Sequence, residues 1–416
     1  MHYVIIGAGP AGVTAAETLR SRDPEGSITL IGDEPEPAYS RMAIPYLLAG
    51  DIGEEGTWLR HGDDHFDNLG IQRVQDRVTA IDSGARNLTL ASGGGLSFDR
   101  LLLASGSEAV SPPIAGLDQP GIHHCWTLED ARHIMELARE GKRVVLMGAG
   151  FIGSIIMEAL ARRGVELTVV EAGDRMVPRM MDRTAGGLIG QWCRSKGVTV
   201  RTSTRITAVN ADPGGSFRFL LECDPGEALP ADLLVVATGV RPRLDYLRGS
   251  GIDTDSGVLV DGRLQTSVPG IYAAGDVCQG HDWGSSDRSV HAIQPVAVET
   301  GRLAAINMSG GEVRHQGSMD MNVLDALGLI CTSYGRWMGV DGGDSAELLD
   351  ADRYRYVKLQ FEEDRLVGAI TLGRTEQVGV LRGLIQSRVR LGPWKARLQQ
   401  DPNRIMEAYL ASTQSF

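Results

Sequence analysis

The sequence lacks three features, and each absence excludes a class of protein. No stretch approaches the roughly 18 uninterrupted apolar residues that a membrane-spanning helix requires, so a membrane span is not expected. The five cysteines are scattered and form neither a C-x-x-C pair nor a metal-ligand spacing, which predicts small buried thiols in a reducing compartment. Acidic residues outnumber basic ones, 53 to 41, and the net charge of −12 disfavours nucleic acid as a partner.

The sequence also leaves no room for a signal peptide. The apolar run Tyr3 to Ile6 begins almost at the first residue, so we expect a cytoplasmic location. Glycine, in contrast, is abundant, with 53 residues in 416. Because the glycines cluster in loops between apolar runs, they indicate an α/β architecture with tight strand-to-helix turns, and the length predicts two or three domains.

The first informative motif is a glycine fingerprint near the N-terminus. The apolar run from Tyr3 leads into Gly7-Ala8-Gly9-Pro10-Ala11-Gly12 and then into good helix formers. In a G-x-G-x-x-G turn the glycines allow a tight turn, close approach of a pyrophosphate and close packing of helix on strand. A second strand, Ser27 to Ile31, ends in Asp33 and Glu34, about 20 residues later, where a carboxylate would bind a ribose. The series predicts a dinucleotide site.

The same pattern recurs in the middle of the chain. The run Arg143 to Met147 precedes Gly148-Ala149-Gly150-Phe151-Ile152-Gly153, a helical stretch continues through Leu160 to Arg163, and Leu167 to Val170 leads into Glu171. A second pair of matched segments follows, "FDRLLLASG" up to Gly106 and "ADLLVVATG" up to Gly239. The chain is therefore predicted to contain two dinucleotide-binding units of similar size, one inserted in the other.

These segments resemble the pyridine nucleotide–disulfide oxidoreductase superfamily of two-dinucleotide flavoproteins. A fifth segment, Gly270 to Asp276, is similar to the family's late FAD signature. Tyr39-Ser40-Arg41 and "DRLVGAITLG" (Asp364 to Gly373) look most like nitrite reductase flavin modules and rubredoxin or ferredoxin reductases. The resemblance implies two Rossmann-like, three-layer domains of the glutathione-reductase type plus a smaller α+β C-terminal domain.

The domain boundaries follow from the same resemblance. We expect an FAD-binding domain in two segments, 1–110 and 241–315, an NAD(P)H-binding domain over 111–240, and a C-terminal interface domain over 316–416. Relatives use the interface domain to form homodimers. The resemblance assigns to FAD the residues Gly7, Gly9, Pro10, Ala11, Gly12, Asp33, Glu34, Arg41, Val78, Ala104, Ser105, Gly106, Gly275, Asp276, Glu299 and Thr300.

The second fingerprint is assigned to the nicotinamide nucleotide. A carboxylate at Glu171 accepts the 2′-hydroxyl of NADH and repels the 2′-phosphate of NADPH, so NADH is favoured, although Arg175 could soften that discrimination. The helix that starts near Pro295 resembles the one whose N-terminal amides approach the flavin pyrimidine, where they would stabilise negative charge. The residues assigned to NAD are Gly148, Gly150, Phe151, Ile152, Gly153, Glu171 and Gly239.

The family's usual reactive side chains are missing from this chain. Met42 occupies the position of the redox cysteine in the disulfide-reductase and peroxidase branches, and methionine forms neither a disulfide nor a thiolate. The ferredoxin-reductase branch pairs a lysine with a glutamate, but the matching positions are Tyr46 and Ile155. Glu158 could compensate, or could lie on a solvated helix face. No catalytic residue is therefore assigned, and Tyr46, Glu158 and His291 remain candidates near the flavin.

Two further groups stay open. His281 and His291 follow Asp276 and could relay a proton or be structural, and Cys278 has no second thiol close in sequence. At the C-terminal end, the runs 357–361 and 366–370 predict a hairpin turning at Asp364. A helix with Val380, Leu381, Leu384 and Ile385 on one face, and a last helix over 405–410, are also expected. The local excess of Arg and Lys over 381–397 is typical of a solvated face.

Together these observations predict an FAD-dependent NAD(P)H oxidoreductase. It would pass electrons from NADH through flavin to a non-disulfide acceptor, namely a small redox protein, a partner subunit or a small molecule. One alternative is an NADH-binding flavoprotein with slow turnover that acts as a sensor or scaffold. Another is a thiol-based oxidase or peroxidase, or a disulfide reductase, which the absence of cysteine at position 42 disfavours. No metal is expected.

Overall fold

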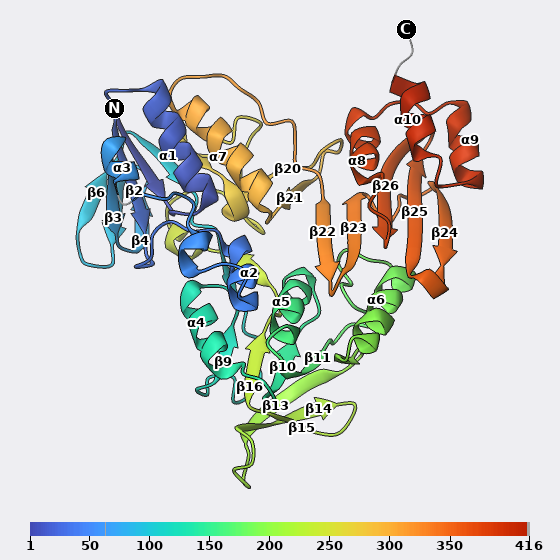
Figure 1. Ribbon diagram of the computed structural model, residues 1–416. Coiled ribbons are helices and arrows are strands. Elements are labelled where there is room, and N and C mark those ends of the chain that lie inside the picture. Colours follow the sequence, from blue (N-terminus) through green and yellow to red (C-terminus); the bar gives the residue numbers. More distant parts are fainter. Residues whose placement is uncertain (63, 414–416) are drawn as a thin grey trace. The chain divides into compact units, whose positions relative to one another are not determined.

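The computed structural model describes residues 1–62 and 64–413, and the chain divides into two compact units (Figure 1). The first unit combines Met1–Ala109 with Val240–Ser318, and the second combines Val110–Gly239 with Met319–Phe416. Each unit is thus assembled from segments that are far apart in sequence. In Figure 1 the first unit is coloured blue to cyan and yellow to light orange, and the second is coloured teal to green and orange to red.

A five-stranded parallel sheet forms the centre of the first unit. Its order is β19-β7-β1-β2-β3. The edge strand β19, which comes last in sequence among these five strands, pairs with β7. Apolar residues occupy both faces of β1 and β2, as expected for a sheet covered on both sides. The strands are β1 (His2–Ile6), β2 (Ser27–Gly32), β3 (Ile71–Gln75), β7 (Arg100–Leu103) and β19 (Ile271–Ala273).

Helices α1 (Pro10–Arg22) and α7 (Gln294–Met308) pack directly against each other in this unit. Their close approach needs glycine, because a Cβ at Gly301 would lie 2.3 Å from the carbonyl oxygen of Ala11. The segment that returns after the insertion therefore completes the first core. Shorter helices are η1 (Arg41–Ala43), α2 (Ile44–Ala49), η2 (Glu54–Thr57), α3 (His65–Asn68), η3 (Asp245–Leu247) and η4 (Gly275–Val277).

Three small sheets complete the first unit. One is a meander, one joins the two chain segments, and one pairs β18 with the hairpin β20–β21 that lies between η4 and α7. Their strands are β4 (Val78–Asp82), β5 (Asn87–Leu90) and β6 (Gly95–Ser97); β8 (Ser107–Ala109) and β17 (Val240–Pro242); and β18 (Val258–Leu259), β20 (Cys278–His281) and β21 (Arg288–Val290).

The second unit repeats the parallel sheet, in the order β12-β11-β10-β16-β9. The predicted strand 143–147 is confirmed, whereas α5 ends at Ala161, two residues before the predicted Arg163. The elements are β9 (Ile122–His124), α4 (Leu128–Leu137), β10 (Arg143–Met147), α5 (Phe151–Ala161), β11 (Glu166–Val170), α6 (Arg183–Ser195), β12 (Thr199–Arg201), β13 (Arg205–Ala211), β14 (Phe219–Asp224), β15 (Leu229–Ala231) and β16 (Leu233–Val236).

A five-stranded antiparallel sheet, β22-β23-β26-β25-β24, forms the C-terminal part of the second unit. The predicted hairpin is confirmed as β25 and β26, with Asp364 in the turn, and the predicted apolar helix face is buried at Leu381, Leu384 and Ile385. The elements are β22 (Met321–Ala326), β23 (Leu329–Gly335), β24 (Asp344–Asp350), η5 (Ala351–Arg353), β25 (Arg355–Glu362), β26 (Arg365–Leu372), α8 (Val378–Ser387), α9 (Pro393–Gln400) and α10 (Ile405–Thr413).

Side chains fasten this antiparallel sheet to the parallel-sheet part of the second unit. Asp182, the N-cap of α6, accepts hydrogen bonds from the Tyr356 hydroxyl at 2.8 Å and from Lys358 Nζ at 3.1 Å. The indole of Trp192 donates to the Leu327 carbonyl at 3.2 Å. Burial, and then the bond to Asp182, raise the pKa of Tyr356, so its hydroxyl stays protonated and remains a donor in this cluster.

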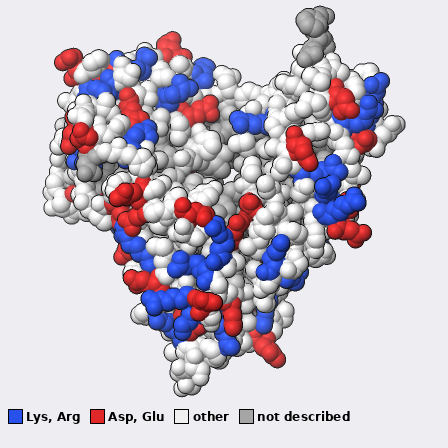
Figure 2. Space-filling model, viewed as in Figure 1, with Lys and Arg blue, Asp and Glu red and all other residues white. Residues whose placement is uncertain are grey.

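Two surface findings accompany the fold. Among residues 1–62 and 64–413, no helix combines the length and the apolar character that crossing a membrane would require. Acidic and basic side chains are intermixed over the face shown in Figure 2 rather than separated into fields of one sign. The net charge of −12 is therefore dispersed on this face.

Candidate functional site

The glycine loop after β1 has one glycine that faces open space and two that are packed. A Cβ at Gly7 would lie 2.1 Å from the Ala104 carbonyl oxygen, and one at Gly12 would lie 1.8 Å from the Gly7 carbonyl oxygen. Gly9, the N-cap of α1, has nothing within 4 Å of its Cβ position. The first and third glycines thus let strand and helix approach, and the second leaves room for a ligand at the start of the helix.

Pro10 and Ala11 follow this opening as the first residues of α1. Proline at the first helical position costs no hydrogen bond, because that N–H has no partner within the helix. The next amides of the helix remain available at its positive end, which is an arrangement suited to a pyrophosphate.

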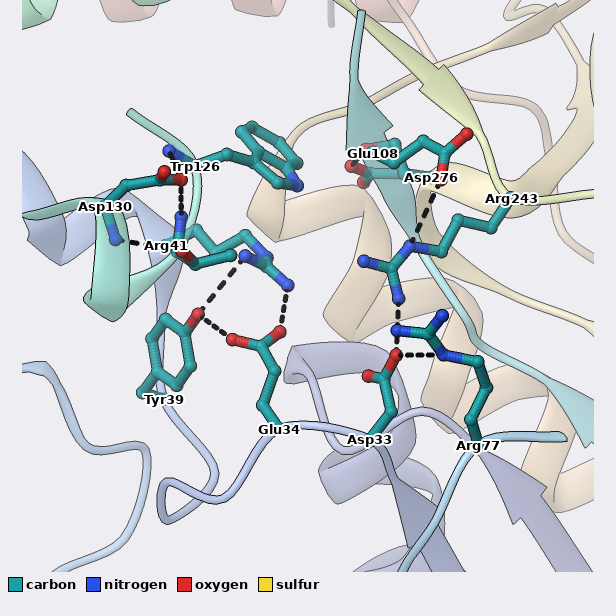
Figure 3. Close-up of polar contacts among 12 residues, drawn as sticks. Asp33, Glu34, Tyr39, Arg41, Arg77, Glu108, Trp126, Asp130, Arg243 and Asp276 are labelled. Atoms are coloured by element: carbon teal, nitrogen blue, oxygen red, sulfur yellow. Dashed lines mark hydrogen bonds and ion pairs between the residues drawn. The ribbon is translucent and has the colours of Figure 1, made fainter. Parts of the chain in front are cut away.

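A cluster of three polar side chains lies beyond the end of β2 (Figure 3). Glu34 accepts hydrogen bonds from the Tyr39 hydroxyl and from Arg41 Nη2, each at 2.5 Å. Arg41 Nη1 also donates to the Tyr39 oxygen, at 3.2 Å. The side chains of Arg41 and Glu34 retain 27% and 26% exposure, so the cluster is fixed in place yet open to a ligand.

Asp33 lies between two guanidinium groups in the same view. Its Oδ2 is 3.2 Å from Arg77 Nε and 3.1 Å from Arg243 Nη1. Arg243 comes from the segment after the insertion, and the Glu108 carboxylate also lies 3.9 Å from its Nε. Asp33 therefore joins the two chain segments of the first unit.

Asp276, in η4, presents a partly buried carboxyl to the same region. The hydroxyl of Ser107 donates to its Oδ2 at 2.7 Å. Burial raises the pKa of the Asp276 carboxyl, while the Ser107 hydrogen bond and then the charge of Arg41 oppose that rise. The guanidinium of Arg41, bonded to Glu34, thus favours the charged form of the Asp276 carboxyl.

Helix α7 begins close to Asp276. The hydroxyl of Thr300 accepts the Gly275 N–H at 3.0 Å and donates to the Val296 carbonyl at 2.6 Å. Thr300 is buried and supports the loop before Asp276, whereas Glu299 is exposed. Thr300 thus acts on this site through the backbone.

The segment after β7 borders the same glycine loop. Ala104 donates its N–H to the Ile6 carbonyl at 2.8 Å, and Ser105 Oγ lies 2.9 Å from the hydroxyl of the buried Tyr246. Gly106 adopts a φ of +67°, a conformation that suits glycine. Val78 is buried at the start of β4.

The loop after β10 reproduces the geometry of the first loop. A Cβ at Gly148 would lie 2.4 Å from the Ala237 carbonyl oxygen, and one at Gly153 would lie 2.2 Å from the Gly148 carbonyl oxygen. Gly150, the N-cap of α5, has nothing within 4 Å of its Cβ position. Phe151 and Ile152 are half-buried in the first turn of α5. The second unit therefore holds a second opening of the same form.

Glu171 lies immediately after β11 and is bonded to both flanking loops. Its Oε2 accepts the Ala149 N–H at 2.7 Å, and its Oε1 accepts the Gly173 N–H at 2.6 Å. Gly239, after β16, has a φ of +116° and open space at its Cβ position. Two bonds to backbone amides hold the Glu171 carboxylate at the mouth of the glycine loop.

Arg175 is occupied within its own loop. Its Nε donates to the Met181 carbonyl at 2.9 Å, and its Nη2 donates to the Pro178 carbonyl at 3.2 Å. Its Nη1 pairs with Asp174 at 2.6 Å. Because all three nitrogens are engaged, this guanidinium is poorly placed to receive a 2′-phosphate.

The positions that carry reactive groups in other branches are exposed here. Met42, in η1, is 46% exposed, and Tyr46, in α2, is 58% exposed. Glu158 lies elsewhere, in the second unit, where its Oε2 accepts the Leu327 N–H at 3.2 Å from the β22–β23 turn. In the described structure Glu158 therefore contacts the C-terminal sheet.

The five cysteines are unpaired, and Cys125, Cys193, Cys278 and Cys331 are buried. Burial raises the pKa of Cys278 to about 12 and that of Cys193 to about 11. These thiols are therefore protonated near neutral pH. Within the described part of the chain, no group of three or more His, Cys, Asp or Glu residues is arranged to hold a metal ion.

His291 and Asp282 form a hydrogen-bonded pair in the segment between η4 and α7. His291 Nε2 lies 2.8 Å from Asp282 Oδ1, and the Ser289 hydroxyl donates to Asp282 Oδ2 at 2.8 Å. His281 lies at the end of β20 in the same hairpin. The hairpin and the residue that follows it thus contain the two histidines for which the sequence left a proton-relay role and a structural role open.

Sequence reasoning missed several members of these clusters. Tyr39, Arg77, Ser107 and Arg243 were not assigned, although each is bonded to an assigned carboxylate. Tyr39 could have been found, because it lies five residues after Glu34. Arg243 is 210 residues from Asp33, so no local pattern connects the two.

Two glycine loops of one geometry, each on a parallel sheet, define a protein with two dinucleotide sites. Comparison with protein families agrees with this description. Residues 1–301 match the pyridine nucleotide-disulphide oxidoreductase family, and residues 321–389 match the rubredoxin NAD+ reductase C-terminal domain. The chain belongs to the pyridine nucleotide-disulphide oxidoreductase family. It is an FAD-dependent oxidoreductase that uses a nicotinamide nucleotide.

Individual proteins support the assignment. The chain is 31% identical over 414 residues to the NADH-dependent phenylglyoxylate dehydrogenase subunit epsilon of Aromatoleum evansii, covering 99% of this chain and 97% of that protein. It is 35% identical over 281 residues to the biphenyl dioxygenase system ferredoxin–NAD(+) reductase component of Paraburkholderia xenovorans (strain LB400), covering 66% of each chain.

A solved structure shows the same fold along the whole chain. Putidaredoxin reductase, in its covalent complex with putidaredoxin, matches with a TM-score of 0.90 over 100% of this chain and 99% of that one, at 24% identity. The residues present fit the expected FAD. The open face at Gly9 suits a pyrophosphate, and the partly buried Asp276 carboxyl suits a hydroxylated chain.

Proposed function

We propose that this chain oxidises NADH and passes the electrons, through bound FAD, to a protein acceptor without using a redox-active cysteine. The observation that carries the proposal is the combination of two open glycine loops with Met42 at the cysteine position and four buried cysteines. Bound FAD supplies the conversion between two-electron and one-electron transfer. The residues of this chain would bind and orient the two nucleotides.

The first unit is proposed as the FAD domain. Its amides at the start of α1 would hold the pyrophosphate, with Arg41 beside it, and Glu34 would bind the adenosine ribose. We favour Glu34 over Asp33 for the ribose because Asp33 is already shared between Arg77 and Arg243. Asp276 would accept a hydrogen bond from the ribityl chain.

The second unit is proposed to bind NADH through the loop after β10. The carboxylate of Glu171, held by two backbone amides, would accept hydrogen bonds from the ribose hydroxyls and would repel a 2′-phosphate. Arg175, bonded within its own loop, would not offset that repulsion. These contacts support NADH over NADPH.

The acceptor is proposed to be a protein that carries its own redox centre, either an iron–sulfur protein or a partner subunit. Two relatives support this class, because their names describe a dehydrogenase subunit and a ferredoxin reductase component. The buried cysteines with raised pKa values argue against a disulfide acceptor route. We further propose a homodimer, since the edge strand β24 exposes Leu348 and Leu349. We also propose a cytoplasmic location, because the five cysteines are unpaired.

Anaerobic stopped-flow spectroscopy tests the function. NADH should bleach the FAD absorbance in a few seconds or less. A [2Fe–2S] ferredoxin should then restore the absorbance, whereas oxidised glutathione should not. Slow reduction, with a long-lived charge-transfer band, would indicate the NADH-binding sensor instead. Rapid reoxidation by glutathione disulfide or peroxide would contradict the proposed acceptor class. Sedimentation velocity measures the dimer separately.

A further inference from the structure

His291 is a nearly buried histidine with a fixed carboxylate partner. Its side chain is 7% exposed and its Nε2 lies 2.8 Å from Asp282 Oδ1. Asp282 is itself held in place, because its Oδ2 accepts a hydrogen bond from the Ser289 hydroxyl at 2.8 Å. A buried imidazole with this support can hold a proton at a defined position.

The pair lies between the two elements that are proposed to contact FAD. Asp276, in η4, precedes β20, and the β20–β21 hairpin leads into α7. The Ile293 N–H donates to the His291 carbonyl at 2.9 Å, and Ile293 is the N-cap of α7. His291 is therefore anchored at the start of the helix whose N-terminal amides would face the flavin.

Opposing charges act on the imidazole at this position. The carboxylate of Asp282 favours the charged imidazolium, whereas the positive end of the α7 dipole and the low exposure disfavour it. Two-electron reduction of a nearby cofactor adds negative charge, which shifts this balance towards the imidazolium. The pair is thus placed to respond to the redox state of the site.

Other titratable and charged groups surround the pair. Burial lowers the pKa of His315, the Glu299 carboxylate opposes that change, and His291 and His281 add to it. Glu299, His291 and His281 therefore all lie within electrostatic range of His315. The hairpin also contributes Asp287 and Arg288, and Glu299 is the acidic residue of α7 in this neighbourhood.

We propose that the His291–Asp282 pair takes up one proton from solvent when bound FAD receives two electrons, and releases it when the electrons leave. The inference rests on the proposed function. The balance is complete: NADH gives up a hydride and becomes NAD+, the electrons and one proton go to FAD, and the second proton comes from water to His291. On transfer of two electrons to a protein acceptor, both protons return to solvent.

Spectroelectrochemical titration of the FAD-loaded protein measures this proton directly. The midpoint potential is recorded between about pH 6 and pH 8.5, where histidine titrates, for the wild type, His291→Gln and Asp282→Asn. The slope of midpoint potential against pH gives the number of protons taken up with two electrons. This number should be lower in both variants than in the wild type, and in His291→Gln it should be lower by nearly one. His61→Gln, which changes an exposed histidine, should keep the wild-type slope.

The outcomes separate the inference from the function on which it rests. Equal slopes for the wild type and His291→Gln, in protein that NADH still reduces, would overturn the proton role alone. Failure of the wild type to bind FAD or to be reduced by NADH would overturn the proposed function. If His291→Gln does not fold, Asp282→Asn and His291→Asn supply the same comparison. The electrode sets the redox state of the FAD directly, so none of these measurements depends on turnover.

Discussion

Glu171 and Ala149 are joined by a hydrogen bond of 2.7 Å from the Ala149 N–H to Glu171 Oε2. The bond connects the residue after β11 to the glycine loop after β10. It makes the carboxylate proposed to bind the ribose and the loop proposed to bind the pyrophosphate one structural element, so that the position of one sets the position of the other.

Replacing Glu171 should therefore weaken NADH binding. Glu171→Ala removes a charged acceptor whose hydrogen bonds are worth about 1.5–3 kcal/mol, so we expect a roughly 10- to 150-fold higher Kd for NADH. Isothermal titration with NADH, on protein whose FAD has already been reduced, measures this Kd. Glu171→Gln is the matched control, because its amide oxygen can still accept from Ala149 while the charge is lost. An unchanged Kd in Glu171→Ala would remove Glu171 from the site.

The same pair of variants tests nucleotide choice. Glu171→Gln no longer repels a 2′-phosphate, so the ratio of kcat/KM for NADH to that for NADPH should fall, and the ratio is measured with ferricyanide as acceptor. The bonds of Arg175 to Met181 and Pro178 predict that the variant gains little direct affinity for the phosphate. A ratio that stays at the wild-type value would show that discrimination lies elsewhere.

Substitution of Gly148 should impair the proposed NADH site without impairing the proposed FAD site. A Cβ there would lie 2.4 Å from the Ala237 carbonyl oxygen, so Gly148→Val must displace the loop after β10. Misplacement by about 1 Å can cost roughly 100-fold in rate, and we expect at least that loss in NADH-dependent reduction, with FAD still bound. Gly187→Ala, in an open position of α6, is the control. Normal reduction in Gly148→Val would exclude this loop as the donor site.

The cysteine thiols should be neither oxidised nor reduced during turnover. Burial raises the pKa of Cys278 to about 12, and the thiolate required for exchange is scarce below that pH. Titration with a disulfide reagent in the native state should therefore give the same thiol count before and after reduction by NADH. Cys278→Ser should retain NADH-dependent ferredoxin reduction. Two thiols that appear only after reduction would reveal a redox disulfide.

Acid should destabilise the protein partly through Glu17, in α1. Its carboxylate binds Arg60 Nε and Nη2, each at 2.6 Å, and His65 Nε2 at 2.8 Å. Burial raises the pKa of Glu17, but the hydrogen bonds from Arg60 and His65 outweigh it and the net change is a decrease. A depressed pKa means that the contribution is present above the unfolded value, about 4.3, and is lost as the pH falls through the folded value.

Urea unfolding at pH 7 and at lower pH measures this contribution. Glu17→Gln should lower the free energy of unfolding by about 1 kcal/mol at pH 7, since the pair is partly exposed, and should flatten the decline on acidification. Glu25→Gln, at an exposed position nearby in sequence, should behave as the wild type. Parallel acid profiles for the wild type and Glu17→Gln would contradict the role of this carboxylate.

Local sequence patterns predicted much of the candidate site. The residues of both glycine loops and the acids after β2 and β11 could be predicted because each depends on neighbours within about 25 residues, and the chain places them by strand and helix geometry alone. Tertiary partners could not be predicted in this way. Tyr356 meets Asp182 across 174 residues, and neither belongs to a motif.

The sequence by itself determined that two dinucleotide loops exist, that a cysteine is absent beside the first, and that a β hairpin and apolar helix face lie near the C-terminal end. These follow from turn chemistry and hydrophobic period, which are local. Only the tertiary structure decided that Asp33 joins Arg77 to Arg243, that Glu158 binds the β22–β23 turn, and that His291 has Asp282 as partner. Those pairings depend on how distant segments pack, because an ion pair or hydrogen bond requires a distance that no spacing in the sequence specifies.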